Sequence, residues 1–100
     1  MRLASEAESP ALWHLMGAYL HQDFDLSGTI EDNIDLFTQE PADLVQALPD
    51  EVDRALRELT TEAELKSFVG ELGCQVRPPA GLTYREWLTR IADRVRAATA

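Results

Sequence analysis

The stretch TTEAELKSFVGELG, residues 60–73, carries signals for both the start and the end of a helix. Thr61 and Glu64 stand three residues apart, the spacing of a capping box, in which each side chain accepts a hydrogen bond from the other residue's backbone amide. Gly73 follows as a residue that readily adopts the left-handed conformation found at many helix ends. The stretch is therefore predicted to form one short helix.

Two further helix starts lie toward the ends of the chain. Thr83 and Glu86 repeat the capping box, and Ser9 followed by Pro10 combines a favoured N-cap with a favoured first helical residue. The helix that begins at Pro10 is expected to end near His21. Apolar residues follow both starts at spacings of three and four, which indicates amphipathic helices. They are Leu12, Leu15, Met16, Tyr19 and Leu20 in the first helix, and Tyr84, Trp87, Leu88, Ile91 and Val95 in the last.

The middle of the chain predicts a second helix over about 30–38 and a third helical stretch over about 41–59. Pro49 lies inside the third pattern; it lacks an amide hydrogen and clashes with the preceding turn, so we expect a kink or two short helices there. Residues 74–78, CQVRP, are the only weak candidate for a strand. The apolar positions are Ile30, Ile34 and Phe37 in the second helix, and Leu44, Leu48, Val52, Leu56 and Leu59 in the third.

The predicted fold class is all-α, a compact bundle of about five short helices. We expect a flexible N-terminal segment over 1–8 and a single domain over 9–100. No apolar run approaches the ~20 residues needed to cross a bilayer, and the short, acidic N-terminus does not resemble a signal peptide. Cys74 is the only cysteine, which excludes an internal disulfide. A cytoplasmic location is therefore expected.

The charge is unevenly distributed along the chain. The net charge is −9; residues 1–50 hold ten acids and one base, whereas residues 51–100 hold eight of each. An acidic surface can simply keep a domain soluble, or it can attract a basic partner. The charge argues strongly against direct binding of nucleic acid, which requires Lys and Arg to displace counterions.

The stretch DFDLSGTIEDNI, which begins at Asp23, resembles a helix–loop–helix calcium loop up to its last residue. Asp23, Asp25 and Ser27 occupy the first, third and fifth positions, and Gly28 takes the sharp turn at the sixth. The twelfth position should be a bidentate Glu but is Ile34, which has no oxygen in its side chain. The same residues also suit a helix entry in which Asp25 or Ser27 forms the cap. We therefore predict no metal site.

Catalytic and cofactor-binding motifs are absent from the sequence. It contains no nucleophile elbow, phosphate-binding glycine loop, C-x-x-C or H-E-x-x-H pattern, so neither an enzyme activity nor a cofactor is predicted. His14 and His21 lack further Cys or His neighbours that would complete a zinc site. Trp13 and Trp87 lie on apolar helix faces and are expected in the core, although Trp13 could also anchor a partner.

Taken as a whole, the chain resembles the immunity proteins of contact-dependent growth inhibition systems. The resemblance is carried by LWHLMGAYLHQDFDL, residues 12–26, by EVDRALRELTTEAELKSFVGELG, residues 51–73, and by GLTYREWLTRI, residues 81–91. It covers about 11–97. It implies a cytoplasmic bacterial protein that binds the C-terminal toxin domain of a cognate effector, in many cases a nuclease with a basic cleft, and blocks it.

The resemblance and the charge together indicate which residues contact the toxin domain. His21 and Asp23 belong to the shared motif, so they serve either the fold or the interface. Glu31, Asp32 and Asp35 are expected on the polar side of the second helix. The predicted partner-binding residues are His21, Asp23, Asp25, Glu31, Asp32, Asp35, Glu40 and Asp43. A monomer or weak dimer is expected, and an atypical calcium-binding module or a generic adaptor remain the alternatives.

Overall fold

The computed structural model describes residues 4–20 and 28–99, and helices dominate this part of the chain. The elements are α1 (Pro10–His14), which continues as the π-helix η1 (Leu15–Tyr19), then α2 (Ile30–Phe37), α3 (Ala42–Glu58), α4 (Glu62–Glu71) and α5 (Tyr84–Thr99). No strand occurs among the described residues, so CQVRP is not one. The predicted all-α class with five helices is confirmed.

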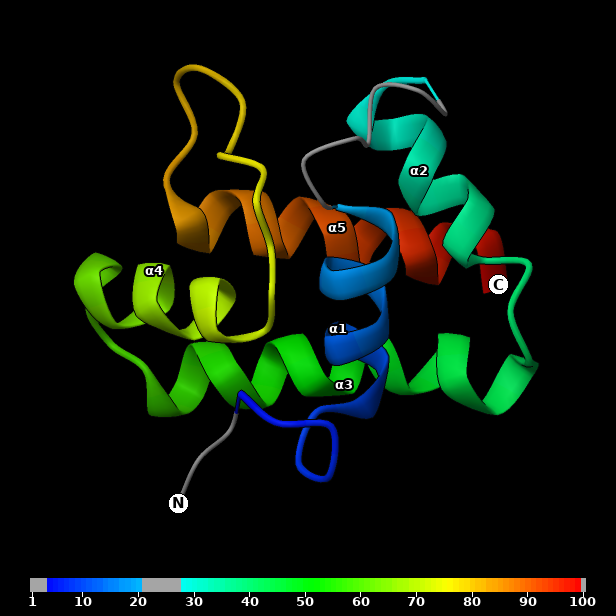
Figure 1. Cartoon of the computed structure of the whole chain (residues 1–100), viewed down its shortest axis with the longest axis horizontal. Coiled ribbons are helices and arrows are strands. Elements are labelled where there is room, and N and C mark those ends of the chain that lie inside the picture. The colour runs from blue at the N-terminus through cyan, green and yellow to red at the C-terminus, as the bar shows by residue number, and fades with distance from the viewer. Residues whose placement is uncertain (1–3, 21–27, 100) are drawn as a thin grey trace.

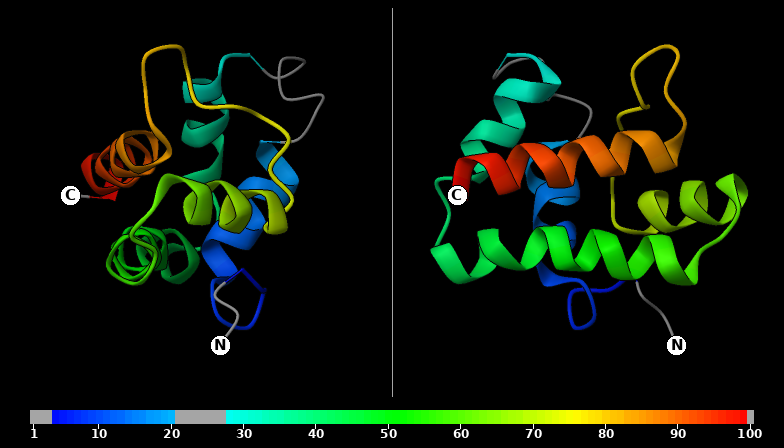
Figure 2. Two further views of the ribbon diagram at one scale, coloured as in Figure 1. Left: turned by 90° about the vertical axis from the view of Figure 1, so that its left-hand side faces the viewer. Right: turned by 180° about the vertical axis from the view of Figure 1, so that it is seen from behind.

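The two long helices form the frame of the molecule. Figure 1 shows α3 and α5 running in opposite directions, with α1 crossing them and α2 and α4 at opposite ends of α5. In the side view of Figure 2, α1 and α4 lie on one side of this pair. The contacts agree, because α3 packs against both α5 and α1, and α5 also packs against α2 and α4. No helix within the described ranges is long and apolar enough to span a membrane.

The core lies where α1–η1, α3 and α5 meet. Its largest side chains are almost completely shielded from solvent, and burial of each such side chain contributes about 1.5–3 kcal/mol relative to exposure. They are Phe37, Leu12, Leu15, Met16, Leu20, Leu48, Leu65, Leu72, Leu88, Ile91, Val45 and Val52. Trp87 is also buried, as expected, with 2% of its surface exposed.

Pro49 does not divide the third helix. α3 runs as one helix from Ala42 to Glu58 with Pro49 inside it and buried, so the alternative of two short helices is wrong. Proline removes one amide donor from a helix, at a cost of about 3 kcal/mol. Packing offsets this cost, since Val45, Leu48 and Val52 of the same helix are buried in the core.

The N-terminus of α1 is capped by a side chain from another helix. Ser9 occupies the N-cap position but makes no side-chain capping bond. Instead, Glu51 of α3 accepts hydrogen bonds from the amides of Ala11 (3.1 Å) and Leu12 (2.8 Å). Burial raises the pKa of Glu51, although the hydrogen bonds from the amides of Leu12 and Ala11 act in the opposite direction and lower it. A five-residue helix, too short to be stable alone, is thereby anchored on α3.

The N-terminus of α5 is capped in a similar way. Thr83 and Glu86 form the predicted capping box, with bonds of 3.0 and 3.1 Å. Glu62, the first residue of α4, adds acceptors for the amides of Tyr84 (2.7 Å) and Arg85 (3.2 Å). These bonds satisfy amides that a helix leaves free at its start. The acidic residues therefore tie neighbouring helices together at their ends.

A close backbone contact joins η1 to the end of α4. Gly73 has a φ of +97°, as predicted for a residue that ends a helix. A Cβ atom built on Gly73 would lie 3.6 Å from the Cα of Gly17, and one built on Gly17 would lie 3.7 Å from the carbonyl oxygen of Leu72. The amide of Gln75 then donates to the carbonyl of Leu20 at 3.0 Å. The backbones of η1 and of the end of α4 therefore lie close together at Gly17 and Gly73.

Residues 4–8 form a turn that contacts α3. Ala4 is buried, the amide of Ser9 donates to the carbonyl of Ser5 at 2.8 Å, and Glu8 pairs with Arg54 at 3.1 Å. The division into a flexible segment 1–8 and a domain 9–100 stays a prediction.

Removing the carboxylate of Glu51 should destabilise the fold. Glu51→Ala leaves the amides of Ala11 and Leu12, both in fully buried residues, without an acceptor. We expect the free energy of unfolding in urea to fall by about 1–3 kcal/mol. Asp50→Ala, at the exposed neighbour, is the control and should change it by less than about 0.5 kcal/mol. Equal stability of the two variants would refute a role of Glu51 as a cap.

Candidate functional site

The structure describes five of the eight predicted partner-binding residues. Glu31, Asp32 and Asp35 lie on α2, Asp43 lies in the first turn of α3, and Glu40 lies between these helices. His21, Asp23 and Asp25 lie outside the described residues, as do the first, third and fifth positions of the calcium-loop pattern. Within the described ranges, no three His, Cys, Asp or Glu residues are grouped closely enough to hold a metal ion.

Asp32 is engaged at the start of α2. Its Oδ2 atom accepts from the amide of Thr29 at 3.0 Å, while the Thr29 hydroxyl accepts from the amide of Asp32 at 3.1 Å. The N-cap is therefore Thr29, and the suggestion of Asp25 or Ser27 is wrong. Gly28, with a φ of +119°, leaves no room for a side chain, because a Cβ atom there would lie 2.5 Å from Asp32 Oδ2. Asp32 thus fixes the entry into α2.

Asp35 joins α2 to α5 through Arg94. Two parallel hydrogen bonds of 2.8 Å connect the guanidinium of Arg94 to the carboxylate. These bonds lower the pKa of Asp35. The side chain of Asp35 is 51% exposed and that of Arg94 43%, so the pair contributes only about 0–1 kcal/mol to stability. Its main effect on the surface is to neutralise the charge of Asp35.

Glu40 joins a cluster of aromatic side chains. Its Oε2 atom accepts from the hydroxyl of Tyr19 and lies 3.0 Å from Nε2 of His14. The rings of Tyr19 and Phe37 meet edge to face at 6.0 Å. Hydrogen bonds from Tyr19 and His14 lower the pKa of Glu40, whereas burial and the nearby carboxylate raise the pKa of Tyr19 to about 12. The cluster connects η1 to the segment between α2 and α3.

Glu31 and Asp43 are the predicted acids whose carboxylates remain available. Both are exposed, and neither makes a hydrogen bond or ion pair with the part of the chain that the structure describes. Glu31 lines a cleft of about 250 Å³ between α2 and α5, where Arg90 and Arg94 also lie. Asp43 directly precedes Leu44, and Leu44 lines a larger groove.

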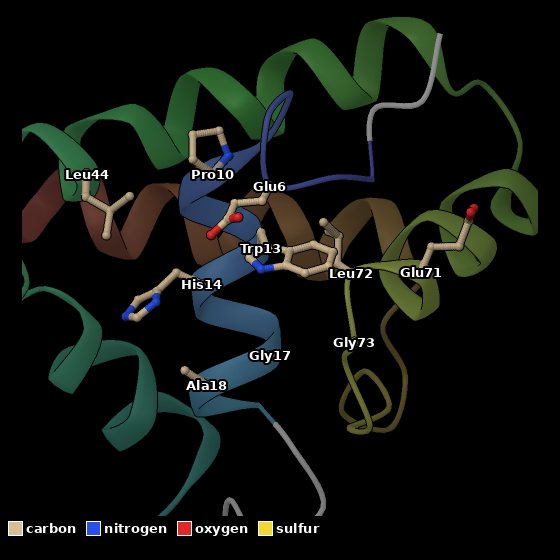
Figure 3. Close-up of a pocket in the computed structure, with 10 residues that line it drawn as sticks. All are labelled: Glu6, Pro10, Trp13, His14, Gly17, Ala18, Leu44, Glu71, Leu72 and Gly73. Atoms are coloured by element: carbon tan, nitrogen blue, oxygen red, sulfur yellow. The ribbon is translucent and has the colours of Figure 1, made fainter.

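The larger groove follows α1 and η1 and has a volume of about 580 Å³. Trp13 lies in it with 39% of its surface exposed, in contrast to the buried Trp87. Figure 3 shows the carboxylate of Glu6 reaching over α1 beside Pro10 and the indole ring of Trp13 extending toward Leu72. The sequence did not predict Glu6 as a site residue, and its only signal was membership of the acidic half.

Comparison with models of known protein families identifies the class of this protein. The family model described as "CdiI immunity protein" matches residues 8–95, and the chain therefore belongs to this family of contact-dependent growth inhibition systems. Membership makes it a toxin-neutralising immunity protein. No curated protein and no solved structure matches the chain.

The contact between Tyr19 and Glu40 predicts a pH dependence. In a Tyr84→Phe variant, Tyr19 is the remaining tyrosine, and its phenolate absorbance should appear near pH 12 rather than at the ordinary pKa of 10.0. Because the pKa is raised in the folded protein, the stabilisation is present below pH 10 and is lost as the pH rises through about 12. Adding Glu40→Gln should lower the pKa, although burial keeps it above 10.0. A pKa of 10.0 before and after this change would contradict the contact.

Proposed function

We propose that this protein binds the C-terminal toxin domain of a cognate effector, a nuclease with a basic cleft, and blocks it by covering that cleft with acidic side chains. It acts in the cytoplasm as a monomer or weak dimer, without catalysis and without a cofactor. The observation that carries the proposal is membership of the immunity family combined with a net charge of −9. A nuclease grips phosphates with Lys and Arg, and carboxylates are the groups that pair with these cations.

The available carboxylates support this mode of binding. Glu31 and Asp43 are exposed near the start of α2 and of α3. Neither has a partner among residues 4–20 and 28–99, so a toxin domain can meet these charges without breaking a contact described there. Asp32, Asp35 and Glu40 already have intramolecular partners, so they are less available to a toxin domain. His21, Asp23 and Asp25 stay predicted contacts. Such a field speeds the encounter with a basic domain and rejects nucleic acid.

The proposal is tested with the toxin domain of the effector encoded beside this gene. The purified toxin domain is mixed with the wild-type protein, and both its nuclease activity and the dissociation constant are measured. One equivalent of immunity protein should abolish cleavage of nucleic acid, with a dissociation constant in the nanomolar range or below. Full nuclease activity in the presence of excess immunity protein would contradict the proposal.

Charge reversal at the two available acids should weaken binding. We expect Glu31→Lys with Asp43→Lys to raise the dissociation constant at least tenfold at low salt, mainly through slower association. Each residue lies in the first turn of a helix, so the change also costs about 0.3–1 kcal/mol of helix-dipole stabilisation per site.

The matched control is the neutral pair Glu31→Gln with Asp43→Asn. This pair changes the net charge by half as much as the double reversal. It should therefore have an intermediate effect on the association rate, with little loss of stability. Reversal of Asp32 and Asp35 is a poorer test, because it also breaks the cap of α2 and the pair with Arg94. If both double variants bound the toxin domain like the wild type, Glu31 and Asp43 would lie outside the interface.

A further inference from the structure

We propose that the groove along α1 is the anchoring point of the interface and takes a Lys or Arg side chain from a loop of the toxin domain. The cationic group stacks on the indole ring of Trp13 and pairs with the carboxylate of Glu6. This inference rests on the proposed function, to which it adds the location of the central contact and the chemistry of the residue that fills it. Neither Trp13 nor Glu6 is among the eight partner-binding residues that the sequence predicted.

The groove has the size and the shape of a binding site. Its volume of about 580 Å³ falls within the roughly 300–1,000 Å³ typical of ligand clefts. Its lining comes from the turn before α1, from α1 and η1, from the first turn of α3 and from the end of α4. Small residues leave the central space open, namely Gly17, Ala18 and Gly73 (Figure 3).

The charge of the groove favours a cation. Glu6 lines it, and the described residues that line it include no Lys or Arg. Glu6 is exposed. The cleft between α2 and α5 differs, because Arg90 and Arg94 line it together with Glu31. Of the two hollows, the groove along α1 is therefore the one that would attract a basic side chain.

Trp13 supplies the second half of the recognition. An indole face attracts Lys and Arg, with an energy of about 0.5–1 kcal/mol when exposed and about 2 kcal/mol when water is excluded. A tryptophan that remains 39% exposed in the free protein has apolar surface left to bury in a complex. Tryptophan is also among the residues that most often dominate binding energy at the centre of an interface.

The groove is held in shape before binding. Glu51 fixes the first turn of α1, and the hydrogen bond from the amide of Gln75 to the carbonyl of Leu20 joins the end of η1 to the segment after α4. A π-helical turn such as η1 occurs frequently at functional sites. Because the walls are already ordered, little conformational entropy is lost when a loop enters. A second copy of this chain is a poor occupant, since two surfaces of the same negative charge repel each other.

The test uses the toxin domain encoded beside this gene and three variants. Trp13→Ala removes the stacking surface, Glu6→Lys reverses the charge, and Ala18→Arg keeps Trp13 but fills the groove with a cation of its own. We expect Trp13→Ala to raise the dissociation constant about 30-fold or more, and the other two at least tenfold. Asp50→Lys makes the same change in net charge as Glu6→Lys at an exposed position outside the groove, and should change it less than threefold.

Acrylamide quenching of tryptophan fluorescence gives a readout that needs no variant. Trp13 is exposed and Trp87 is buried, so quenching of the free protein reports mainly on Trp13. Addition of the toxin domain should reduce this quenching. Wild-type binding accompanied by unchanged quenching, or by unchanged affinity of Trp13→Ala and Ala18→Arg, would overturn the inference while leaving the proposed function intact. Failure of the wild type to bind would remove both. Self-association of the free protein that Trp13→Ala abolishes would assign the groove to a second copy instead.

Discussion

The carboxylate of Glu51, seated on the amides of Ala11 and Leu12, is the contact on which the N-terminal half depends. Without it, the short α1 would begin with unpaired amides inside the core, which costs about 1–3 kcal/mol. α1 in turn carries η1. Together they place Trp13 in the groove and bring His14 and Tyr19 to Glu40. Glu62 likewise accepts a hydrogen bond from the amide of Tyr84 at the start of α5. The fold therefore uses acids to join helix ends, in addition to apolar packing.

This use of acids changes the meaning of the net charge. Several carboxylates cap helices or pair with an arginine of the same chain, among them Asp32, Asp35, Glu64 and Glu86. The charge that a partner meets comes from the remaining acids, and their position matters more than their number. Glu6 in the groove, Glu31 in the cleft between α2 and α5, and Asp43 at the start of α3 are exposed acids of the N-terminal half. The groove places an aromatic ring beside this charge, which a solubilising surface does not require.

Local rules predicted α4 and α5 well, because the start signal of each helix was complete within a few residues. The capping boxes of Thr61 and Thr83 are both present. Pro49 was misjudged in part, because its cost is local whereas the packing that offsets it comes from other helices. The buried face of α3 is also rotated relative to the predicted one. Val45 and Ala55 are in the core, whereas the predicted Leu44 and Leu56 are half-buried. The site was harder to predict, since the exposure of Trp13 and the pairing of Asp35 with Arg94 both depend on tertiary contacts.

Electrostatic attraction between the surplus carboxylates and a basic toxin domain is the central claim, and the salt dependence of association tests it most directly. The association rate constant is measured by stopped flow from about 0.01 M to about 1 M ionic strength, where the Debye length falls from about 30 Å to about 3 Å. Attraction by the acidic surface predicts that the rate constant falls at least tenfold while dissociation changes little. An association rate that is independent of salt would contradict the claim.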